Sequence, residues 1–564
     1  MTNLYKEARN RLNFFLLLIG LCFLIIIGRL FWLQVIKHEV FSEKAHHQQQ
    51  RTITLAARRG NIYDSKNELL ATSISVKSLY AIPKIMTDKK RLSHKLSGIL
   101  DVPASKIYKS INNKRYFVWL KRKLSPQQLA QVKKLKNPGL KLLNEEKRFY
   151  LYENLASHLL GFTNIDNQGL SGIELAYNKH LSGSPGKFVI QSDLFGREIF
   201  SHTRKVQEPK DGKKIYLTIH SFLQYVAERE LERAVKKTSA NSGCAIILDP
   251  YQGDILAMAS YPYYNPNYYY KYPRKNRINK AVETVYEPGS TFKSITIAAA
   301  LNERIVAPDT EIECPYAIKV GGRTISDSHK HPTEIKTVTE ILAESLNTGT
   351  AKIALKLGKS KLYQYIKGFG FGQLTGIRLP GESRGILRPE NKWSKSDEGI
   401  IPFGHSIAVT PVQLISAIGA LANNGILYQP NIIKYMESED GSYLKGFPAK
   451  QVRQIITPKI ARQVREMMHK VTTEGTGFYA RIYGYNVAGK TGTAQKVNPN
   501  GPGYLKHRYI SSFVGFLPAK NPKAVILVVI DDPAYGRHSG SVSAAPAFKR
   551  IAEETIRYLS IPPK

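Results

Sequence analysis

The hydrophobic and polar positions of the chain set one stretch apart from the rest. Residues 12–36, LNFFLLLIGLCFLIIIGRLFWLQVI, are apolar except for Asn13, Arg29 and Gln34. As a helix that rises 1.5 Å per residue, this run is about 37 Å long, which is enough to cross a bilayer with some tilt. No second apolar run of this length follows it. The pattern therefore predicts one transmembrane helix.

Basic residues in front of this run give its expected orientation. Lys6, Arg9 and Arg11 precede it, and an excess of Lys and Arg favours the cytoplasmic side of a membrane. A cleaved signal peptide is the alternative, but the run is longer than a usual signal core and no small-x-small cleavage site follows it. We therefore expect a cytoplasmic tail over 1–11, an uncleaved anchor over 12–36, and export of everything after the anchor.

The exported part divides near a charged break. Residues 37–210 are mixed, basic and built from short elements, and the segment EPKDGKK (208–214) has the Pro, Gly and charge of a linker. From residue 211 onward the apolar and polar residues alternate in longer periodic runs. We predict a first domain over 37–210 and a second domain over 211–564.

Periodicity is clearest in the second domain. Apolar and β-branched runs predict strands at 215–219, twice within 243–260, at 511–518 and at 524–533. Apolar residues at helical spacing predict helices at 223–238 and 545–559. Because these strands flank a long and mostly helical middle, we expect an α+β domain whose antiparallel sheet is flanked by helices.

The charge changes the range of expected partners. The 564 residues include 82 Lys and Arg against 44 Asp and Glu, a formal net charge of +38. Such a surplus attracts polyanions, namely nucleic acid, anionic lipid or an acidic wall polymer, although solvation of the surface explains many lysines equally well. An exported domain rarely meets nucleic acid, so we expect no nucleic-acid partner. With Cys22 in the apolar run, the pairing of Cys244 and Cys314 stays open.

Ser290 and Lys293 stand at the start of a strongly apolar predicted helix, in YEPGSTFKSITIAAAL (286–301). Residues i and i+3 lie about one turn apart on nearly the same helix face, so Lys293 can reach the Ser290 hydroxyl. Burial of this helix would lower the pKa of the Lys293 amine toward its neutral, proton-accepting form. A serine at an electropositive helix start, with such an amine beside it, is an activated nucleophile.

The Ser-x-x-Lys spacing is weak evidence by itself. It occurs again at Ser184, in a Gly/Pro-rich loop, and at Ser442, in an acidic turn. Only Ser290 opens an apolar helix. A simple helix cap is the alternative role for it.

A second segment, AGKTGTAQK, contains Lys490, Thr491, Gly492 and Thr493, and Lys-Thr-Gly occurs once in the chain. A glycine beside a cation on an edge strand lets a substrate backbone come close. The backbone N–H groups of Thr493 and Ser290 could then form an oxyanion hole. A phosphate-binding loop is the alternative, but the earlier glycine of that motif is missing.

A third segment, ESLNTGTAKIAL, places Ser345 and Asn347 between the other two motifs and at the predicted start of a helical stretch. Ser-x-Asn also begins at Ser65, Ser110 and Ser239, but none of these falls between the other motifs. The Ser345 hydroxyl could relay a proton to a leaving amine, and Asn347 could bind a substrate amide. The three motifs are individually weak and together, in this order, strong.

Ser-x-x-Lys, Ser-x-Asn and Lys-Thr-Gly in this order resemble the motif set of penicillin-binding proteins and serine β-lactamases. ARRGNIYDSKNELLA (57–71) is similar to the Arg-Gly-x-Ile-x-Asp segment of class B penicillin-binding proteins. NQGLSGIELAYNKHLSGSPGK (167–187) resembles their Gly-x-x-Gly-x-Glu segment, through Gly169, Gly172 and Glu174. The likeness covers nearly the whole chain. It implies a transpeptidase domain over 211–564, a non-catalytic α+β pedestal domain over 37–210 and one transmembrane helix.

The resemblance also implies a reaction, that of a serine-type D-Ala-D-Ala transpeptidase without a metal or organic cofactor. Ser290 would attack the D-Ala-D-Ala carbonyl of a donor stem peptide, with Lys293 as general base. Ser345, with help from Lys490, would protonate the leaving D-Ala. The amine of a neighbouring stem peptide would then resolve the acyl-enzyme. The two threonines of Lys-Thr-Gly-Thr would hold the carboxylate of the substrate or of a β-lactam.

Within the class, the compact length and SLNTGTAKIAL most resemble the septal, cell-division transpeptidase of the bacterial inner membrane, with its catalytic domain in the periplasm. The implied partners are a membrane-embedded, lipid II-polymerising glycosyltransferase and other divisome proteins, with β-lactams as covalent inhibitors. The alternatives are an elongation-type class B transpeptidase and a β-lactam sensor or hydrolase. A non-enzymatic basic scaffold is a third reading, but it leaves the ordered motifs unexplained.

Two clusters fall outside this set. CPYAIKVGGRTISDSHKHP (314–332) gathers Cys314, Asp327, His329 and His331, a combination that could bind zinc. We favour a polar loop near the rim of the active site and expect no metal. The tyrosine-rich stretch 261–277 suggests a stacking surface, and we favour a mobile loop that contacts glycan or membrane.

Overall fold

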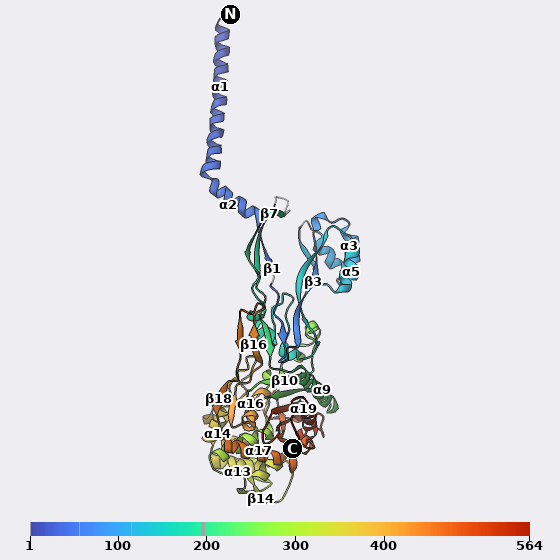
Figure 1. Ribbon diagram of the computed structural model, residues 1–564, viewed down its shortest axis with the longest axis vertical. Coiled ribbons are helices and arrows are strands. Elements are labelled where there is room, and N and C mark those ends of the chain that lie inside the picture. The colour runs from blue at the N-terminus through green and yellow to red at the C-terminus, as the bar shows by residue number, and fades with distance from the viewer. Residues whose placement is uncertain (1, 56, 114, 193–197, 564) are drawn as a thin grey trace. The chain divides into compact units, whose positions relative to one another are not determined.

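The computed structural model describes residues 2–55, 57–113, 115–192 and 198–563 (Figure 1). The chain forms two compact units. The first consists of Met1–Ala57 with Gly183–Lys210, and the second of Arg58–Ser182 with Asp211–Lys564. The predicted domain limits at residues 37, 210 and 211 stay a prediction.

The first unit begins with the apolar helix. Helix α1 (Thr2–Phe31) continues through a π-helical turn (Trp32–Ile36) and is followed by α2 (His38–Gln49). In the part of the chain that the structure describes, Tyr5–Ile36 is the one helix long and apolar enough to cross a membrane, with a mean hydropathy of 2.7. It contains the predicted span. Strands β1 (Gln50–Leu55), β6 (Gly186–Ser192) and β7 (Glu198–Gln207) form an antiparallel sheet in that order.

The second unit contains a seven-stranded sheet that draws strands from distant parts of the sequence. Its order is β17-β16-β8-β2-β3-β4, and β5 also pairs with β3. The strands are β2 (Ile62–Tyr63), β3 (Leu69–Ala81), β4 (Val118–Lys121), β5 (Leu140–Tyr150), β8 (Lys214–Leu217), β16 (Ile433–Glu437) and β17 (Leu444–Gly446). The strand predicted at 215–219 is therefore β8, which pairs in parallel with β2 and antiparallel with β16.

Three helices pack against β3 and β5 through a small apolar core (Figure 1). They are α3 (Lys89–Leu100), α4 (Ala104–Ile111) and α5 (Pro126–Lys134). The core contains Leu79 and Ala81 of β3 together with Leu96 and Leu100 of α3, all four fully buried. This part of the chain is thus a mixed α+β structure, as expected.

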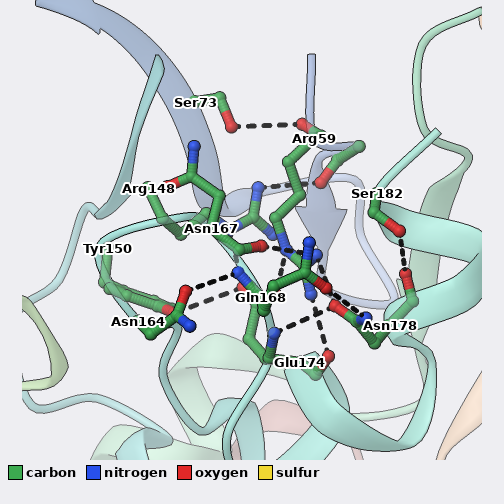
Figure 2. Close-up of polar contacts among 12 residues, drawn as sticks. Arg59, Ser73, Arg148, Tyr150, Asn164, Asn167, Gln168, Glu174, Asn178 and Ser182 are labelled. Atoms are coloured by element: carbon green, nitrogen blue, oxygen red, sulfur yellow. Dashed lines mark hydrogen bonds and ion pairs between the residues drawn. The ribbon is translucent and has the colours of Figure 1, made fainter. Parts of the chain in front are cut away.

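A buried ion-pair network joins the two segments that carry the family resemblance (Figure 2). Glu174 lies on the short helix α7 (Gly172–Ala176) and Asn178 begins α8 (Asn178–Leu181), while α6 (Ser157–Leu160) precedes both in the chain. Arg59 Nε and Arg148 Nε each donate to the Glu174 carboxylate at 2.6 Å. Arg59 Nη1 also donates to Asn178 Oδ1 at 2.8 Å. All three charged side chains are at most 2% exposed. Because water cannot reach them, each charge depends on its ion-pair partner for stabilisation.

The central sheet of the second unit has five antiparallel strands in the order β10-β9-β21-β20-β19. They are β9 (Ser242–Leu248), β10 (Ile255–Tyr261), β19 (Ala488–Val497), β20 (Tyr504–Leu517) and β21 (Ala524–Asp531). The strands predicted within 243–260, at 511–518 and at 524–533 are all confirmed. Strand β19 lies at the edge of the sheet.

Helices cover both faces of this sheet because successive strand residues point to opposite sides. Ala245 and Ile247 of β9 pack with α9 (Ser221–Lys237) and α19 (Ala545–Tyr558). Cys244, Ile246 and Leu248 belong instead to the larger core of the opposite face. The helices of that face are α11 (Lys293–Asn302), α16 (Pro411–Ala422) and α17 (Pro458–Thr473). The predicted helices at 223–238 and 545–559 and the flanked antiparallel sheet are confirmed (Figure 1).

The middle of the unit is mostly helical, as expected. Its helices are α10 (Lys280–Glu283), α12 (Val338–Glu344), α13 (Asn347–Leu357), α14 (Lys359–Gly368) and α15 (Lys395–Ile400), with α18 (Gly540–Ser543) near the end of the chain. Short strand pairs interrupt it: β11 (Glu311–Cys314) with β14 (Glu334–Thr337), β12 (Ala317–Val320) with β13 (Arg323–Ser326), and β15 (Ile426–Tyr428) with β18 (Gln451–Gln454). All three cysteines are free.

Candidate active site

Ser290 lies in a 3-10 turn (Gly289–Phe292) directly ahead of α11. The nine residues from Lys293 to Leu301 are all buried, which confirms the predicted burial of this helix. The sequence placed Ser290 at the start of the helix, and in the structure the turn carries Ser290 while the α-helix begins at Lys293. In the tighter turn Ser290 stays half-buried at the surface of the core while Lys293 is fully buried.

Strand β19 lies against this turn because Gly492 leaves room for it. A Cβ atom on Gly492 would lie 2.4 Å from Ser512 Oγ and 2.9 Å from the carbonyl oxygen of Pro288. Real Cβ atoms do not approach this closely, so a side chain would push the strand away from the turn. Strand β19 is an edge strand, as expected. The predicted approach of a substrate backbone to Gly492 stays a prediction.

The backbone of Thr493 faces the turn that carries Ser290. Its carbonyl oxygen would lie 3.0 Å from a Cβ atom on Gly289, whose φ is +55°. The N–H and C=O of one strand residue point to the same side. The N–H of Thr493 therefore points to the open edge of β19 rather than to β20. This orientation suits the predicted oxyanion hole, a role that stays a prediction.

Two lysines from different elements converge on the Ser345 hydroxyl. Lys490 Nζ donates to Ser345 Oγ at 2.8 Å, and Lys293 Nζ donates to the same atom at 3.2 Å. Lys293 Nζ also donates to the Ser345 carbonyl oxygen. Ser345 was expected to open a helix, but it ends α12 with a left-handed φ of 64°. Its hydroxyl thus lies in the break between α12 and α13, where both lysines reach it.

The Ser290 hydroxyl is not part of this network. Within the described residues it makes no hydrogen bond, and the Lys293 amine is directed to Ser345. Proton transfer from Ser290 to Lys293 therefore requires a side-chain movement that brings the two groups into hydrogen-bond contact. Catalytic hydrogen bonds are often long or unformed in free enzymes and tighten when the substrate is bound.

Both lysines are fully buried, which changes their protonation. Burial lowers the pKa of Lys293 well below its usual value, and the charge of Lys490 lowers it further, while Asp327 opposes the shift. Burial lowers the pKa of Lys490 to about 7. Burial and the nearby charge of Lys490 thus both act toward the neutral Lys293 amine, the direction that the sequence predicted.

Asp327 positions the Ser345–Asn347 segment, and the sequence reasoning missed this role. Its carboxylate accepts hydrogen bonds from the backbone N–H groups of Asn347 and Thr348, and from Thr348 Oγ1 at 2.8 Å. Helix α13 has no side-chain cap of its own, since Leu346 holds that position. An aspartate 20 residues away in the sequence takes the place of the cap. The apolar residue at the cap position was the one sign in the sequence that the cap had to come from elsewhere.

The other predicted residues lie around this centre. Asn347 Nδ2 donates to the Ser326 carbonyl oxygen at 2.8 Å. Thr491 Oγ1 lies 2.9 Å from Thr476 Oγ1, and Thr493 Oγ1 accepts from the N–H of Gly540 at 3.1 Å. The two hydroxyls thus engage elements beside β19, and their predicted contact with a carboxylate stays a prediction.

The cysteine, aspartate and histidine cluster of residues 314–332 is dispersed. Cys314 is buried in β11, and Asp327 accepts from His331 Nε2 at 3.1 Å. Across the described ranges, no group of three or more His, Cys, Asp or Glu side chains is placed to hold a metal ion. Asp327 instead binds His331 and the start of α13.

Comparison with known protein families identifies the family to which this chain belongs. Residues 243–553, more than half of the chain, match the penicillin-binding protein transpeptidase domain, and residues 54–217 match the penicillin-binding protein dimerisation domain. The chain belongs to the class B penicillin-binding proteins. The resemblance, the fold class and the serine transpeptidase class inferred from the motifs are thereby confirmed.

Named relatives of this penicillin-binding protein cover almost its whole length. It is 34% identical to stage V sporulation protein D of Bacillus subtilis, over 99% of this chain and 87% of that protein. It is 33% identical to the peptidoglycan D,D-transpeptidase FtsI of Escherichia coli K12, over 97% of this chain and 91% of that protein.

Solved structures agree with the fold. A peptidoglycan synthetase from Bifidobacterium adolescentis has a TM-score of 0.74 at 27% identity, covering 92% of this chain and 98% of the other. Penicillin-binding protein 3 from Mycobacterium tuberculosis, complexed with aztreonam, has a TM-score of 0.71 at 26% identity, covering 91% and 98%.

Proposed function

We propose that this penicillin-binding protein is a septal peptidoglycan D,D-transpeptidase that works through an acyl-enzyme on Ser290 and that β-lactams acylate the same serine. The observation that carries the proposal is the convergence of Lys293 and Lys490 on Ser345 Oγ, at 3.2 and 2.8 Å, beside the turn that bears Ser290. The likeness to FtsI supports the septal role.

Acylation follows from the protonation states of the two lysines. Neutral Lys293 accepts the Ser290 proton as Ser290 Oγ attacks the carbonyl carbon of the penultimate D-Ala. The oxyanion lies between the N–H groups of Ser290 and Thr493. The peptide bond then breaks, and the leaving amine takes a proton through the Ser345 hydroxyl, which receives it from a lysine. Both lysines are in place for this relay because each donates to Ser345 Oγ.

Deacylation runs the same path with a new amine. The amino group of a neighbouring stem peptide attacks the ester carbonyl and gives its proton to the relay, and Ser290 leaves with a proton returned from Lys293. Asn347 begins α13 two residues after Ser345, and its amide orients the donor peptide. The balance is one peptide bond broken and one formed, without oxidation or reduction.

The predicted anchor supports a location for this reaction. The helix Tyr5–Ile36 holds the chain in the inner membrane, and the basic residues before it keep residues 1–11 in the cytoplasm. The transpeptidase domain then works in the periplasm on strands made by a membrane-embedded glycosyltransferase of the divisome. That enzyme is the expected partner of the anchor.

Covalent labelling tests the chemistry. The full-length protein in detergent is incubated with a fluorescent penicillin, and the adduct is followed by intact mass. We expect a stable one-to-one adduct that is lost in Ser290→Ala and kept in Ser442→Ala, a serine with the same Ser-x-x-Lys spacing. No adduct on folded wild-type protein would refute the acyl-enzyme, and rapid loss of the adduct would indicate a hydrolase.

Depletion in the source bacterium tests the septal role. Loss of a septal transpeptidase blocks division while growth continues, so cells should form filaments. Cells that become round would instead assign the chain to elongation. A chromosomal copy with Ser290→Ala should give the same phenotype as depletion, since the role depends on acylation.

A further inference from the structure

A cavity of about 500 Å³ opens in the second unit, and none of its lining residues belongs to the active site. Four segments line it, namely Tyr177 and residues 376–378, 429–432 and 445–451. The lining includes three cations, Arg378, Lys445 and Lys450, and no Asp or Glu. A pocket with this composition has room for a small ligand and carries a positive potential.

Two of these cations flank one aromatic ring. The Arg378 guanidinium lies 5.7 Å from the centre of the Phe447 ring, and Lys445 Nζ lies 5.5 Å from it. Among the residues that the structure describes, neither cation forms an ion pair. Both unneutralised charges thus lie beside the same ring, and both residues line the cavity.

The backbone of Arg378 is held in an unfavourable conformation. Its φ is +61°, in the left-handed region that non-glycine residues rarely adopt. Such strain persists only where the surroundings enforce it, and it is concentrated at functional sites. Tyr177 lies beside the arginine: burial raises the pKa of its hydroxyl, and the charge of Arg378 opposes that shift. The Arg378 side chain is exposed, and its guanidinium lies next to the Tyr177 hydroxyl at the cavity.

More positive charge lies next to the cavity. Burial lowers the pKa of His180, and the charges of Lys213, Lys445 and Lys179 lower it further, so each of the three lysines lies near this ring. The nearby carboxylate of Asp254 accepts from Asn431 Nδ2 at 2.9 Å and pairs with none of them. Like charges gathered in this way repel one another, and a bound anion would relieve the repulsion.

We propose that this cavity binds the oxyanion of a small ligand, a carboxylate or a phosphate, between Arg378 and Lys445, with an apolar part of the ligand against Phe447. This site is separate from the acylation chemistry and does not depend on it. A planar guanidinium binds either oxyanion through two hydrogen bonds, so both sources share the chemistry.

Titration calorimetry on the full-length protein in detergent tests the site, with inorganic pyrophosphate as the phosphate probe and glutarate as the carboxylate probe. The test variant is Arg378→Gln with Lys445→Gln. The matched control is Arg274→Gln with Lys275→Gln, which removes the same charges from another exposed segment. Lys445→Glu is a second test variant, and its exposed position leaves the fold unaffected. Circular dichroism checks folding.

We expect at least one probe to bind the wild type one-to-one with a Kd below about 1 mM. Loss of charge-assisted hydrogen bonds should weaken it by about tenfold or more in both test variants, with the control unchanged. The tighter probe identifies the ligand as a phosphate or a carboxylate. Failure of both probes to bind the wild type would overturn the proposal. An equal loss in the control would also overturn it, because net charge alone would then explain the binding.

Discussion

Glu174→Gln should strongly destabilise the part of the second unit that contains β5 and α7. The wild-type carboxylate accepts from Arg59 Nε and Arg148 Nε at 2.6 Å each, and its side chain is 0% exposed. Glutamine keeps the shape but removes the charge, and its NH₂ group would face a guanidinium donor. Two buried cations are left without a counter-charge.

The expected magnitude follows from this burial. Removing one partner of a buried ion pair costs about 3–5 kcal/mol. The two pairs share one carboxylate, so their contributions do not add, and we expect a loss of about 3–5 kcal/mol in total. Asp166→Asn is the matched control in the same region. Its partner is Arg122 and its side chain is 59% exposed, so its loss should stay below about 1 kcal/mol.

Hydrogen exchange by mass spectrometry measures this effect locally, since a chain of several units does not unfold in two states. The readout is the opening free energy of peptides from Leu140–Tyr150 and Gly172–Ala176. A loss in Glu174→Gln of less than about 1 kcal/mol, equal to that in Asp166→Asn, would refute the reasoning.

Acid provides a second check on the same pair. Burial alone would raise the pKa of Glu174, but Arg148 and Arg59 outweigh it, and the pKa is lowered from its usual 4.5. A carboxyl with a lowered folded-state pKa stabilises the fold above its unfolded-state pKa and loses this contribution as the pH falls through the folded-state value. The difference between wild type and Glu174→Gln should therefore be full at pH 7 and shrink below about pH 4.

Three further substitutions test the active site. Lys490→Met should abolish penicillin labelling yet raise the thermal unfolding midpoint at pH 7. Burial lowers the pKa of Lys490 to about 7 in the folded protein, whereas the unfolded chain keeps the lysine protonated up to about pH 10, so the lysine favours the unfolded state. Asp327→Ala should slow labelling and lower stability by about 1–2 kcal/mol in denaturant unfolding, because the first N–H groups of α13 lose their acceptor. Gly492→Ala should slow labelling, measured as an acylation rate, because its Cβ would meet Ser512 Oγ at 2.4 Å.

Each of these has a result that contradicts it. An unfolding midpoint for Lys490→Met that is lower than that of the wild type at pH 7 would mean that the buried lysine stabilises the fold. Asp327→Asn keeps an acceptor oxygen and should retain most of the stability, so an equal loss in both variants would argue against capping. Gly446→Ala has nothing within 4 Å of its new Cβ and is the control for Gly492→Ala. Equal rates in these two variants would exclude the proposed packing.

Much of the fold could be predicted because local patterns in the sequence agree with the tertiary structure. The apolar run over 12–36 lies within one long helix, and the β-branched runs at 511–518 and 524–533 are strands β20 and β21. Strands buried on both faces read as continuous apolar runs, and helices of the outer layer keep a clear period. These signals depend on neighbours in sequence, so they survive without knowledge of the fold.

The sequence by itself also determined the catalytic candidates, because Ser290, Lys293, Ser345 and Lys490 lie in motifs of fixed spacing. It could not determine how the motifs meet. Lys490 and Ser345 are 145 residues apart, and only the packing of β19 against the Ser290 turn brings the lysine to the hydroxyl at 2.8 Å. The same holds for Asp327. No local pattern shows that this aspartate caps α13, because the cap comes from another part of the chain.

The protonation of the site was likewise decided by tertiary structure. A lysine in an apolar segment suggests a lowered pKa, but the shift depends on the water excluded from all sides and on the charges nearby. Lys293 is fully buried with Lys490 next to it, and the two share one hydroxyl. Residue types and their spacing are written in the sequence, whereas burial and long-range proximity exist only once the whole chain has packed.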